Sequence, residues 1–319
     1  MTVASFDAIV VGGGPAGATA ASDLARKGLS VALLDRDGRI KPCGGAVPPR
    51  LIRDFEIPLS LLVARATSAR MIAPSGRAVS MPVGNGFVGM VDRDSFDEWL
   101  RVRAAEMGAT RLTGTFEGME QDPDGGVTLH YRPKGAARGS TVEKVRARFV
   151  VGADGANSAV ARAALPRSSQ PPFVAAYHEV VESPPEGLHG YEGGRCDVFY
   201  QGQVSPDFYG WVFPHGGHAS IGVGSAKKGF ALREATAALR AQTGLDGCRT
   251  VRVEGAPIPM KPRKRWDDGR NVVLAGDAAG VVAPASGEGI YYAMASGRMA
   301  ATAVAEALSH VEEMKSQVY

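Results

Sequence analysis

The chain has 319 residues, of which 45% are hydrophobic and 22% are charged, a composition that is typical of a globular protein and excludes a fully disordered chain. The 36 basic and 33 acidic side chains leave a formal net charge of +3, and no basic stretch alternates with aromatic residues, so we expect no nucleic acid partner. For the densest basic cluster, residues 261–265, a solvated loop is favoured over a contact with an anionic head group or diphosphate.

The cysteines and the hydropathy pattern indicate the compartment. Cys43, Cys196 and Cys248 make an odd count without a CxxC spacing, so we expect neither a disulfide framework nor a metal site, and a reducing cytoplasm fits best. The first apolar run is interrupted at once by glycines, which predicts a core strand and not a signal peptide. No apolar run approaches the roughly 20 residues that span a bilayer, so any membrane association would be peripheral.

The N-terminal stretch predicts a strand, a glycine turn and a helix. Residues 8–11 form the predicted buried strand, and the helix runs to Lys27 and stops at Gly28. The glycines between them follow the dinucleotide fingerprint: the first turns the chain, the second admits a pyrophosphate to the backbone N–H groups, and the third lets helix and strand pack closely. The helix N-terminus then faces the anion. The predicted binding residues of this turn are Gly12, Gly14, Ala16 and Gly17.

Residues 30–35 predict a second strand that ends in Asp35, the position of the acid that accepts hydrogen bonds from an adenosine ribose. A glycine turn can also be a packing turn that binds nothing. The order of strand, turn, Pro15, small helix residues and terminal acid favours a dinucleotide site. This unit alone does not distinguish NAD from FAD.

Residues 36–46 are rich in glycine and predict a loop that passes close to a ligand. Cys43 lies in this loop, where no periodic core pattern exists, so a small buried hydrophobe and a functional thiol have equal weight. Residues 67–81 predict a hairpin. A helix is then expected from Asp92 to Gly108, and Arg93 at its start calls for a partner, although a plain surface charge is the alternative.

Strands are predicted at residues 111–119, 127–131 and 145–151, and the last runs into a glycine-rich segment that contains Asp154. From residue 173 to residue 224 short strands follow one another without helices, which predicts an antiparallel sheet. The expected strands are residues 173–178, 196–200, 209–213 and 219–223, followed by an amphipathic helix over residues 232–243.

The first domain resumes with a predicted buried strand, residues 271–274, that meets Asp277, and a long helix is expected over residues 290–308. In doubly wound sheets ligands lie beyond the carboxyl ends of strands, so this third strand-to-acid junction points to the same site. We therefore predict a dinucleotide-binding domain of residues 1–66, 88–165 and 270–319, and a substrate domain of residues 67–87 and 166–269.

Three separated signals coincide: the N-terminal fingerprint, the segment around Asp154, and Asp277 followed by Gly287-Glu288-Gly289. Together they resemble the single-dinucleotide flavoprotein family of hydroxylases and reductases. The resemblance implies an α/β fold, with a Rossmann-like FAD-binding domain and an inserted, mostly antiparallel β-sheet substrate domain. The residues that it implies for FAD binding are Gly12, Gly14, Ala16, Gly17, Asp35, Arg36, Cys43, Gly44, Gly45, Arg93, Asp154, Asp277, Gly287, Gly289 and Ile290.

Within this set, the resemblance implies that Asp35 binds the adenosine ribose, that Asp277 binds the ribitol chain, and that Arg93 lies near the cofactor. The helix that opens at Gly289 and Ile290 would point its positive end at the flavin pyrimidine, which favours the anionic reduced ring. Because the sequence has no second GxGxxG, NADPH would act as a transient electron donor without a Rossmann unit of its own.

Two further segments, residues 41–45 and 206–214, resemble the KxCGG and PxxYxWxFP motifs of geranylgeranyl reductases. Tyr209, Trp211 and Phe213 alternate and would share one face of a strand. This face fits a sheet core and also a surface against which an isoprenoid chain lies, and both can hold together. The amino-acid sequence around residues 195–200 and 287–292 is most similar to that of the reductases that saturate the geranylgeranyl tail of chlorophylls and bacteriochlorophylls.

The resemblance implies an FAD-dependent reductase of isolated C=C bonds, acting on geranylgeranyl diphosphate or on a pigment-attached tail, without a metal. Reduced flavin can supply a hydride, but a proton must reach the other carbon in a dry pocket. Cys43 is the first candidate for contact with this chemistry, and Tyr209 is the second. An aromatic monooxygenase and a non-enzymatic, flavin-containing prenyl-lipid carrier are the alternatives. Relatives generally continue with a further helical segment, whereas this sequence ends at Tyr319.

Overall fold

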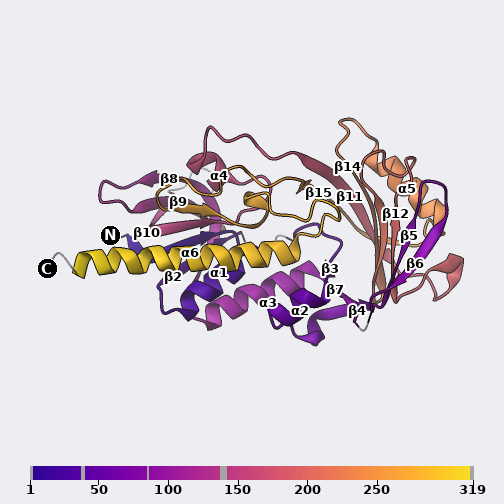
Figure 1. The fold of residues 1–319 in the computed structure, drawn as a ribbon, viewed down its shortest axis with the longest axis horizontal. Helices are drawn as coiled ribbons and strands as arrows, with labels where there is room; N and C mark the ends of the chain where they lie inside the picture. The colour runs from indigo at the N-terminus through magenta and orange to yellow at the C-terminus, as the bar shows by residue number, and fades with distance from the viewer. Residues whose placement is uncertain (1–2, 37–39, 85, 137–141, 317–319) are drawn as a thin grey trace. The chain divides into compact units, whose positions relative to one another are not determined.

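The computed structural model describes residues 3–36, 40–84, 86–136 and 142–316 (Figure 1). The chain divides into two compact units. The first unit comprises Met1–Arg39, Asp97–Pro172 and Pro259–Tyr319, and the second comprises Ile40–Phe96 and Phe173–Ile258.

Residues 166–172 and 259–269, predicted for the substrate domain, group with the first unit, whereas residues 40–66 and 88–96, predicted for the dinucleotide-binding domain, group with the second. A small sheet explains the latter grouping. β7 (Val88–Val91) pairs antiparallel with both β3 (Ala46–Val47) and β4 (Leu62–Ala66). Such non-local pairing leaves no compositional signal in the sequence.

The first unit is built on a six-stranded sheet in the order β1-β2-β8-β9-β10-β16, in which β1 also pairs with β10. β9 runs antiparallel to β8 and β10, and the other pairs are parallel. The strands are β1 (Ala4–Val11), β2 (Val31–Asp35), β8 (Thr110–Gln121), β9 (Val127–Pro133), β10 (Glu143–Gly152) and β16 (Val272–Leu274), which confirms every strand predicted for this domain.

The register of the parallel strands positions the site. Val11 lies opposite Leu34 on one side and Gly152 on the other, and Gly152 lies opposite Leu274. The carboxyl ends of four strands therefore meet at one edge, where open α/β sheets bind ligands.

Successive side chains of β1 point to opposite faces of this sheet, so neighbouring residues pack in different cores. Val10 packs in one core with Leu24 of α1 and Val304 of α6, whereas Ile9 belongs to the core on the other face. α6 lies alongside α1 (Figure 1), and a Cβ built on Gly297 would lie only 2.1 Å from the Ala16 carbonyl oxygen. On the face of Val10 lie α1 (Pro15–Arg26), α3 (Arg93–Glu106) and α6 (Ile290–Ser316), and α6 continues beyond the predicted end at residue 308; α4 (Ala159–Ala164) packs in the core of Ile9 on the other face.

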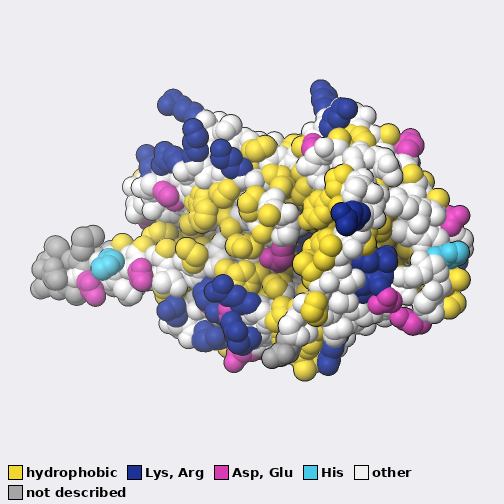
Figure 2. Space-filling view, turned by 45° about the vertical axis from the view of Figure 1, so that its right-hand side comes forward, with side chains coloured by type: hydrophobic (Ala, Val, Ile, Leu, Met, Phe, Trp, Pro, Cys, Tyr) yellow, Lys and Arg dark blue, Asp and Glu magenta, His cyan; other side chains and the backbone are white. Residues whose placement is uncertain are grey.

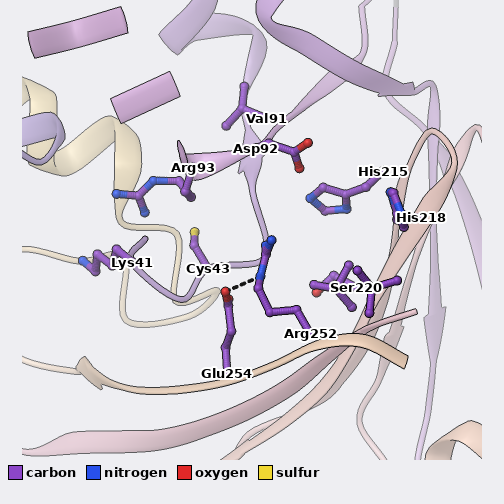
Figure 3. Close-up of a pocket in the computed structure, with 12 residues that line it drawn as sticks. Lys41, Cys43, Val91, Asp92, Arg93, His215, His218, Ser220, Arg252 and Glu254 are labelled. Atoms are coloured by element: carbon purple, nitrogen blue, oxygen red, sulfur yellow. Dashed lines mark ion pairs between the residues drawn. The ribbon is translucent and has the colours of Figure 1, made fainter. Parts of the chain in front are cut away.

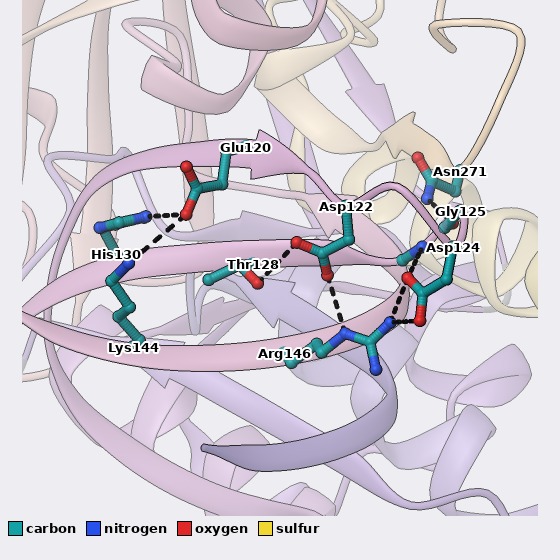
Figure 4. A network of polar contacts seen from close by, with 10 residues as sticks. Glu120, Asp122, Asp124, Gly125, Thr128, His130, Lys144, Arg146 and Asn271 are labelled. Atoms are coloured by element: carbon teal, nitrogen blue, oxygen red, sulfur yellow. Dashed lines mark hydrogen bonds and ion pairs between the residues drawn. The ribbon is translucent and has the colours of Figure 1, made fainter. Parts of the chain in front are cut away.

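The turn between β8 and β9 is tied to β10 by a polar network (Figure 4). Arg146 Nε lies 2.8 Å from Asp122 Oδ2, and the same guanidinium pairs with Asp124. Asn271 Nδ2 donates to the Gly125 carbonyl oxygen at 2.9 Å, which connects the turn to the residue before β16. Exposed ion pairs each contribute about 0–1 kcal/mol, so the network fixes the position of the turn more than it stabilises the unit.

The second unit is built on a seven-stranded sheet in the order β15-β11-β14-β13-β12-β5-β6. The predicted hairpin and the four predicted strands are present, but β12 pairs parallel with β5, while the other described pairs are antiparallel. The strands are β5 (Ser68–Ile72), β6 (Ala78–Pro82), β11 (Phe173–Glu182), β12 (Arg195–Phe199), β13 (Gly210–His215), β14 (His218–Ser225) and β15 (Thr250–Pro259).

One face of this sheet packs against α5 (Leu232–Gln242), where Val212 and Ile221 share a core with Leu239. Because side chains alternate along a strand, Trp211 and Phe213 lie on the opposite face, which carries the site described below. The remaining helical segments are α2 (Pro49–Asp54) and the 3₁₀ turns Leu59–Leu61, Leu188–Gly190 and Gly276–Ala278.

Among the helices of the described residues, none combines the length and the apolar character that crossing a membrane requires. On the face drawn in Figure 2, basic side chains lie in several separate groups with acidic side chains among them.

Candidate functional sites

The glycine turn after β1 has a geometry that only glycine permits. Gly12 has a φ of +106°, and a Cβ there would lie 2.3 Å from the Ala153 carbonyl oxygen. A Cβ on Gly17 would lie 1.8 Å from the Gly12 carbonyl oxygen, whereas Gly14 faces open space. Gly14 is also the N-cap of α1, without a side-chain cap, and the first turn of α1 has no acidic residue. This cradle of uncapped N–H groups fits the diphosphate of a dinucleotide.

Asp35 lies at the end of β2, directly beside this turn. A Cβ on Gly13 would lie 2.7 Å from Asp35 Oδ2, so the carboxylate closes the cradle on one side. Burial raises the pKa of Asp35, against the hydrogen bond from Gly13 and the charge of Arg101. Arg101 Nη1 lies 3.5 Å from Asp35 Oδ2 and donates to the Gly13 carbonyl oxygen at 3.2 Å. Arg101 could not be predicted from the sequence, because it is one of several charged residues in α3.

Asp277 lies in the 3₁₀ turn that follows β16, at the same sheet edge. Gly276 has a φ of +59°, and its Cβ would lie 2.8 Å from Ala16 Cβ, so this turn packs against the start of α1. A Cβ on Gly289 would lie 3.9 Å from Asp277 Oδ1, which brings the start of α6 to the buried carboxylate. Asp277, predicted to bind the ribitol, and Gly289, predicted to lie near the flavin pyrimidine, are therefore close together.

Asp154 lies just beyond β10 and caps a helix. Its carboxylate accepts the Ser158 hydroxyl at 2.5 Å and the backbone N–H of Ala159 at 2.6 Å, at the start of α4. This contact accounts for an acid at this position by local folding, and its contact with FAD stays a prediction.

The N-terminus of α6 is also capped. Glu288 Oε1 accepts the backbone N–H of Tyr291 at 2.8 Å. Burial raises the pKa of Glu288, opposed by hydrogen bonds from Tyr291 and Ile290. When ionised, this carboxylate offsets part of the positive helix end that we predicted at Gly289 and Ile290. Gly287, which precedes it, has a φ of +68°.

In the second unit the two segments that resemble motifs of geranylgeranyl reductases, residues 41–45 and 206–214, meet. Gly44 lies against the aromatic residues of β13: its Cβ would lie 3.1 Å from Phe213 Cδ2 and 3.8 Å from Trp211 Nε1. Gly45 has a φ of +70°, and its Cβ would lie 2.6 Å from His215 Nε2. The loop therefore passes over the aromatic face at a distance that a larger side chain would not permit.

The predicted aromatic strip is a continuous row of rings. The centroids of Tyr209 and Trp211 are 6.0 Å apart, and those of Trp211 and Phe213 are 6.3 Å apart, within the range of aromatic pairs. Tyr209 lies one residue before β13, not inside it as predicted. Burial raises the pKa of Tyr209 strongly, with smaller contributions from Tyr200 and Cys43. The phenol therefore stays protonated at neutral pH and lies near the Cys43 thiol.

A pocket adjoins this face (Figure 3). Cys43 and Arg93, both predicted from the sequence, lie on its wall, and Cys43 Sγ accepts the backbone N–H of Gly45 at 3.4 Å. The half-buried Cys43 is thus a pocket residue and not a core residue. Sequence reasoning missed several lining residues, because they come from separate strands: His215, His218, Ser220, Arg252 and Glu254. Among the described residues no group of three or more His, Cys, Asp or Glu could hold a metal ion.

Comparison with known proteins agrees with this arrangement. An FAD binding domain family matches residues 73–315, and a pyridine nucleotide-disulphide oxidoreductase family matches residues 6–105. Among solved structures, a geranylgeranyl bacteriochlorophyll reductase-like protein from Thermoplasma acidophilum has a TM-score of 0.85 at 25% identity, covering 97% of this chain and 80% of that one. A p-nitrophenol 4-monooxygenase from Pseudomonas putida, with a TM-score of 0.74 at 18% identity over 97% of this chain and 82% of its own, shares the fold alone.

The curated relatives are more specific. The chain is 59% identical over 300 residues to a geranylgeranyl diphosphate reductase of Rhodobacter capsulatus, covering 93% of this chain and 74% of that protein. It is 39% identical over 306 residues to a chloroplastic geranylgeranyl diphosphate reductase of Oryza sativa, covering 92% of this chain and 65% of the relative. The predicted fold and family are confirmed: the chain belongs to the geranylgeranyl reductase family of FAD-dependent oxidoreductases.

Proposed function

We propose that this protein saturates isolated C=C bonds of a geranylgeranyl chain, in the formation of the phytyl tail of (bacterio)chlorophyll. The observation that carries the proposal is the 59% identity to a geranylgeranyl diphosphate reductase over 93% of the chain. It is supported by the meeting of the 41–45 loop with Trp211 and Phe213, two motifs that lie far apart in the sequence.

In the first unit, this chain's own groups bind and orient the cofactor. The uncapped N–H groups at the start of α1 would hold the FAD diphosphate, Asp35 would accept hydrogen bonds from the adenosine ribose, and Asp277 would do so from the ribitol. Bound FAD supplies the hydride chemistry, which the side chains of a protein lack. NADPH is the proposed electron donor, bound transiently because the sequence has one GxGxxG only.

In the second unit, the strip of Tyr209, Trp211 and Phe213 would bind the apolar tail and exclude water. An isolated double bond develops cationic character when it is protonated, and water would intercept this charge. Cys43 and Tyr209 remain the side chains proposed to contact the reacting segment. A tail attached to a pigment would in addition require peripheral contact with a membrane surface.

The test uses two substrates under anaerobic conditions. The FAD-loaded protein is reduced with NADPH and incubated with geranylgeranyl diphosphate or with geranylgeranyl-bacteriochlorophyll, and the tail mass is measured. We expect the mass of at least one substrate to rise by two hydrogen atoms per reduced bond. An aromatic monooxygenase would be inactive without oxygen, and a carrier would bind the tail without changing its mass. Either result would contradict the proposal.

A further inference from the structure

A chain of buried polar groups joins the aromatic strip to the pocket. Trp211 Nε1–H donates to Ser220 Oγ at 3.2 Å, and Ser220 Oγ lies 3.0 Å from His178 Nδ1. His178 Nε2 lies 2.9 Å from Glu254 Oε2, and Arg252 Nε lies 2.5 Å from the other oxygen of Glu254. Ser220 is 1% exposed and His178 is 3% exposed, yet Ser220, Arg252 and Glu254 line the pocket (Figure 3).

The sheet is adapted to hold this chain of groups. Gly222 of β14 lies opposite His178 of β11 on one side and Trp211 of β13 on the other. A Cβ on Gly222 would lie 2.4 Å from His178 Cβ and 2.4 Å from Trp211 Cζ2. The missing side chain lets the two rings approach to 6.1 Å between centroids, with Ser220 bound to both.

The donors and acceptors can be assigned from the chemistry of the groups. The contact of His178 Nε2 with Glu254 Oε2 is a close ion pair without hydrogen-bond geometry, and the negative charge of ionised Glu254 favours a proton on this nitrogen. With a neutral imidazole, His178 Nδ1 is an acceptor and takes the Ser220 hydroxyl proton. With a protonated imidazole, His178 Nδ1–H donates to Ser220 Oγ. Ser220 Oγ then accepts from both His178 and Trp211, so its own O–H is available to donate into the pocket that Ser220 lines.

We propose that Ser220, His178 and Glu254 form a proton relay that supplies the proton added to the geranylgeranyl double bond. The proposal rests on the function proposed above. The π electron pair of the double bond forms one C–H bond with the Ser220 hydroxyl proton, and a hydride, which bound reduced FAD would supply, forms the other. The His178 Nδ1 proton moves to Ser220 Oγ at the same time. His178 is left neutral, and its Nδ1 regains a proton through the Ser220 hydroxyl, which takes one from water in the pocket that Ser220 lines.

The charges around the relay are consistent with this direction of transfer. Burial opposes ionisation of Glu254, but the hydrogen bond and charge of His178 and the charge of Arg252 keep its pKa below the ordinary value. An ionised Glu254 stabilises protonated His178. Burial lowers the pKa of His215, so this second imidazole stays neutral. The other titratable groups that face the pocket are Lys41, Cys43, Asp92, Arg93 and His218.

The test is the pH dependence of a single anaerobic turnover of reduced holoenzyme with geranylgeranyl diphosphate. The wild-type rate should fall as pH rises, because a neutral imidazole binds the Ser220 proton and does not supply one to Ser220. Ser220→Ala should reduce the rate about 100-fold, the lower range for general acid catalysis, and should abolish this fall. The matched control is Ser225→Ala, a buried serine of the same strand whose hydroxyl binds Asp207. It should retain the rate and the pH profile.

A second variant and a second measurement separate proton supply from packing. Glu254→Gln removes the charge that stabilises protonated His178, so it should move the pH midpoint of the rate to lower pH. The NMR titration of His178, assigned by its loss in His178→Gln, should move in the same direction without any turnover. FAD content should not change in Ser220→Ala, whereas its melting temperature should fall, because Trp211 Nε1 and His178 Nδ1 lose a buried hydrogen-bond partner.

Two results would overturn the relay and are distinguishable. If wild-type protein leaves the tail mass unchanged, the proposed function fails and the relay fails with it. If wild-type protein reduces the tail but Ser220→Ala keeps the same rate and pH profile, or changes only KM, the relay alone is wrong. Cys43→Ser should keep the pH profile even where its rate falls, since Cys43 lies outside the relay.

Discussion

Gly44 lies against the ring of Phe213, so closely that a Cβ on Gly44 would stand 3.1 Å from Phe213 Cδ2. This relationship joins a loop that follows the first Rossmann unit in the sequence to a strand of the second unit. It places Cys43 at the edge of the aromatic strip, and the effects of several substitutions follow from it.

Gly45→Ala should displace the loop. Gly45 has a φ of +70°, and the added Cβ would lie 2.5 Å from the Val91 carbonyl oxygen. Strain of this kind costs about 1–3 kcal/mol. We expect a lower melting temperature and reduced tail reduction. Gly202→Ala is the control, because Gly202 has no atom within 4 Å of its Cβ position and no positive φ; equal losses in both variants would contradict the assignment.

Asp277→Ala should purify folded with less bound FAD. Loss of a charge-assisted hydrogen bond to the ribitol costs about 1.5–3 kcal/mol, which weakens FAD binding by roughly 10-fold to 150-fold. Titration of the deflavinated protein with FAD measures the effect. Asp277→Asn keeps the shape of the side chain and removes its charge, so its FAD affinity should lie between that of the wild type and that of Asp277→Ala. Wild-type affinity in Asp277→Ala would remove this residue from the site.

Asp35 should make FAD affinity depend on pH. Its pKa in the folded protein is raised, mainly by burial, so the carboxylate is lost at a higher pH than in an ordinary aspartate. FAD affinity should therefore fall as pH decreases through this pKa, because the protonated acid accepts ribose hydrogen bonds less well. Asp35→Asn should bind FAD weakly at every pH. Wild-type affinity that does not change between neutral and acidic pH would contradict the assignment.

The same shift has the opposite effect on the FAD-free protein. A raised pKa stabilises the folded state below the unfolded pKa, and this contribution is lost as pH rises through the folded pKa. Asp35→Asn should therefore melt above the wild type at neutral pH and together with it at low pH. A variant that is less stable at neutral pH would mean that the carboxylate stabilises the fold.

Cys43→Ser tests the pocket thiol. The substitution nearly preserves volume but changes acidity and nucleophilicity, so tail reduction should fall while FAD content and melting temperature stay the same. Cys248→Ser is the matched control, because Cys248 is also half-buried and belongs to the same unit. Activity that falls only in proportion to stability would show that Cys43 has a packing role.

The elements that depend on local sequence patterns could be predicted from the sequence. The dinucleotide-binding unit is one case, because its parts follow each other directly in the sequence: β1, the glycine turn, α1 and the acid at the end of β2. Their hydrophobic periodicity and spacing were therefore enough to predict it. The alternation of Trp211 and Phe213 likewise predicted one shared face. Asp277 could be placed near the first unit's turn because the carboxyl ends of parallel strands meet at one edge.

The parts that depend on long-range pairing could not be predicted. β5 pairs parallel with β12, whose residues lie far along the chain, and no local signal specifies this. His178 and Glu254 meet across separate strands, and each alone is an ordinary strand residue. Asp154 shows a related limit, because a glycine-flanked acid fits a cofactor ligand and a helix cap equally well; the structure shows the cap, and the contact with FAD stays a prediction.

The central claim is that reduced FAD on this protein hydrogenates an isolated C=C bond. The most direct measurement is a single anaerobic turnover, in which enzyme with stoichiometric reduced FAD is mixed with geranylgeranyl diphosphate and both the flavin absorbance and the product mass are followed. We predict that the flavin is reoxidised as the tail gains two hydrogen atoms per flavin. Flavin that stays reduced, or is reoxidised while the tail mass does not change, would contradict the claim.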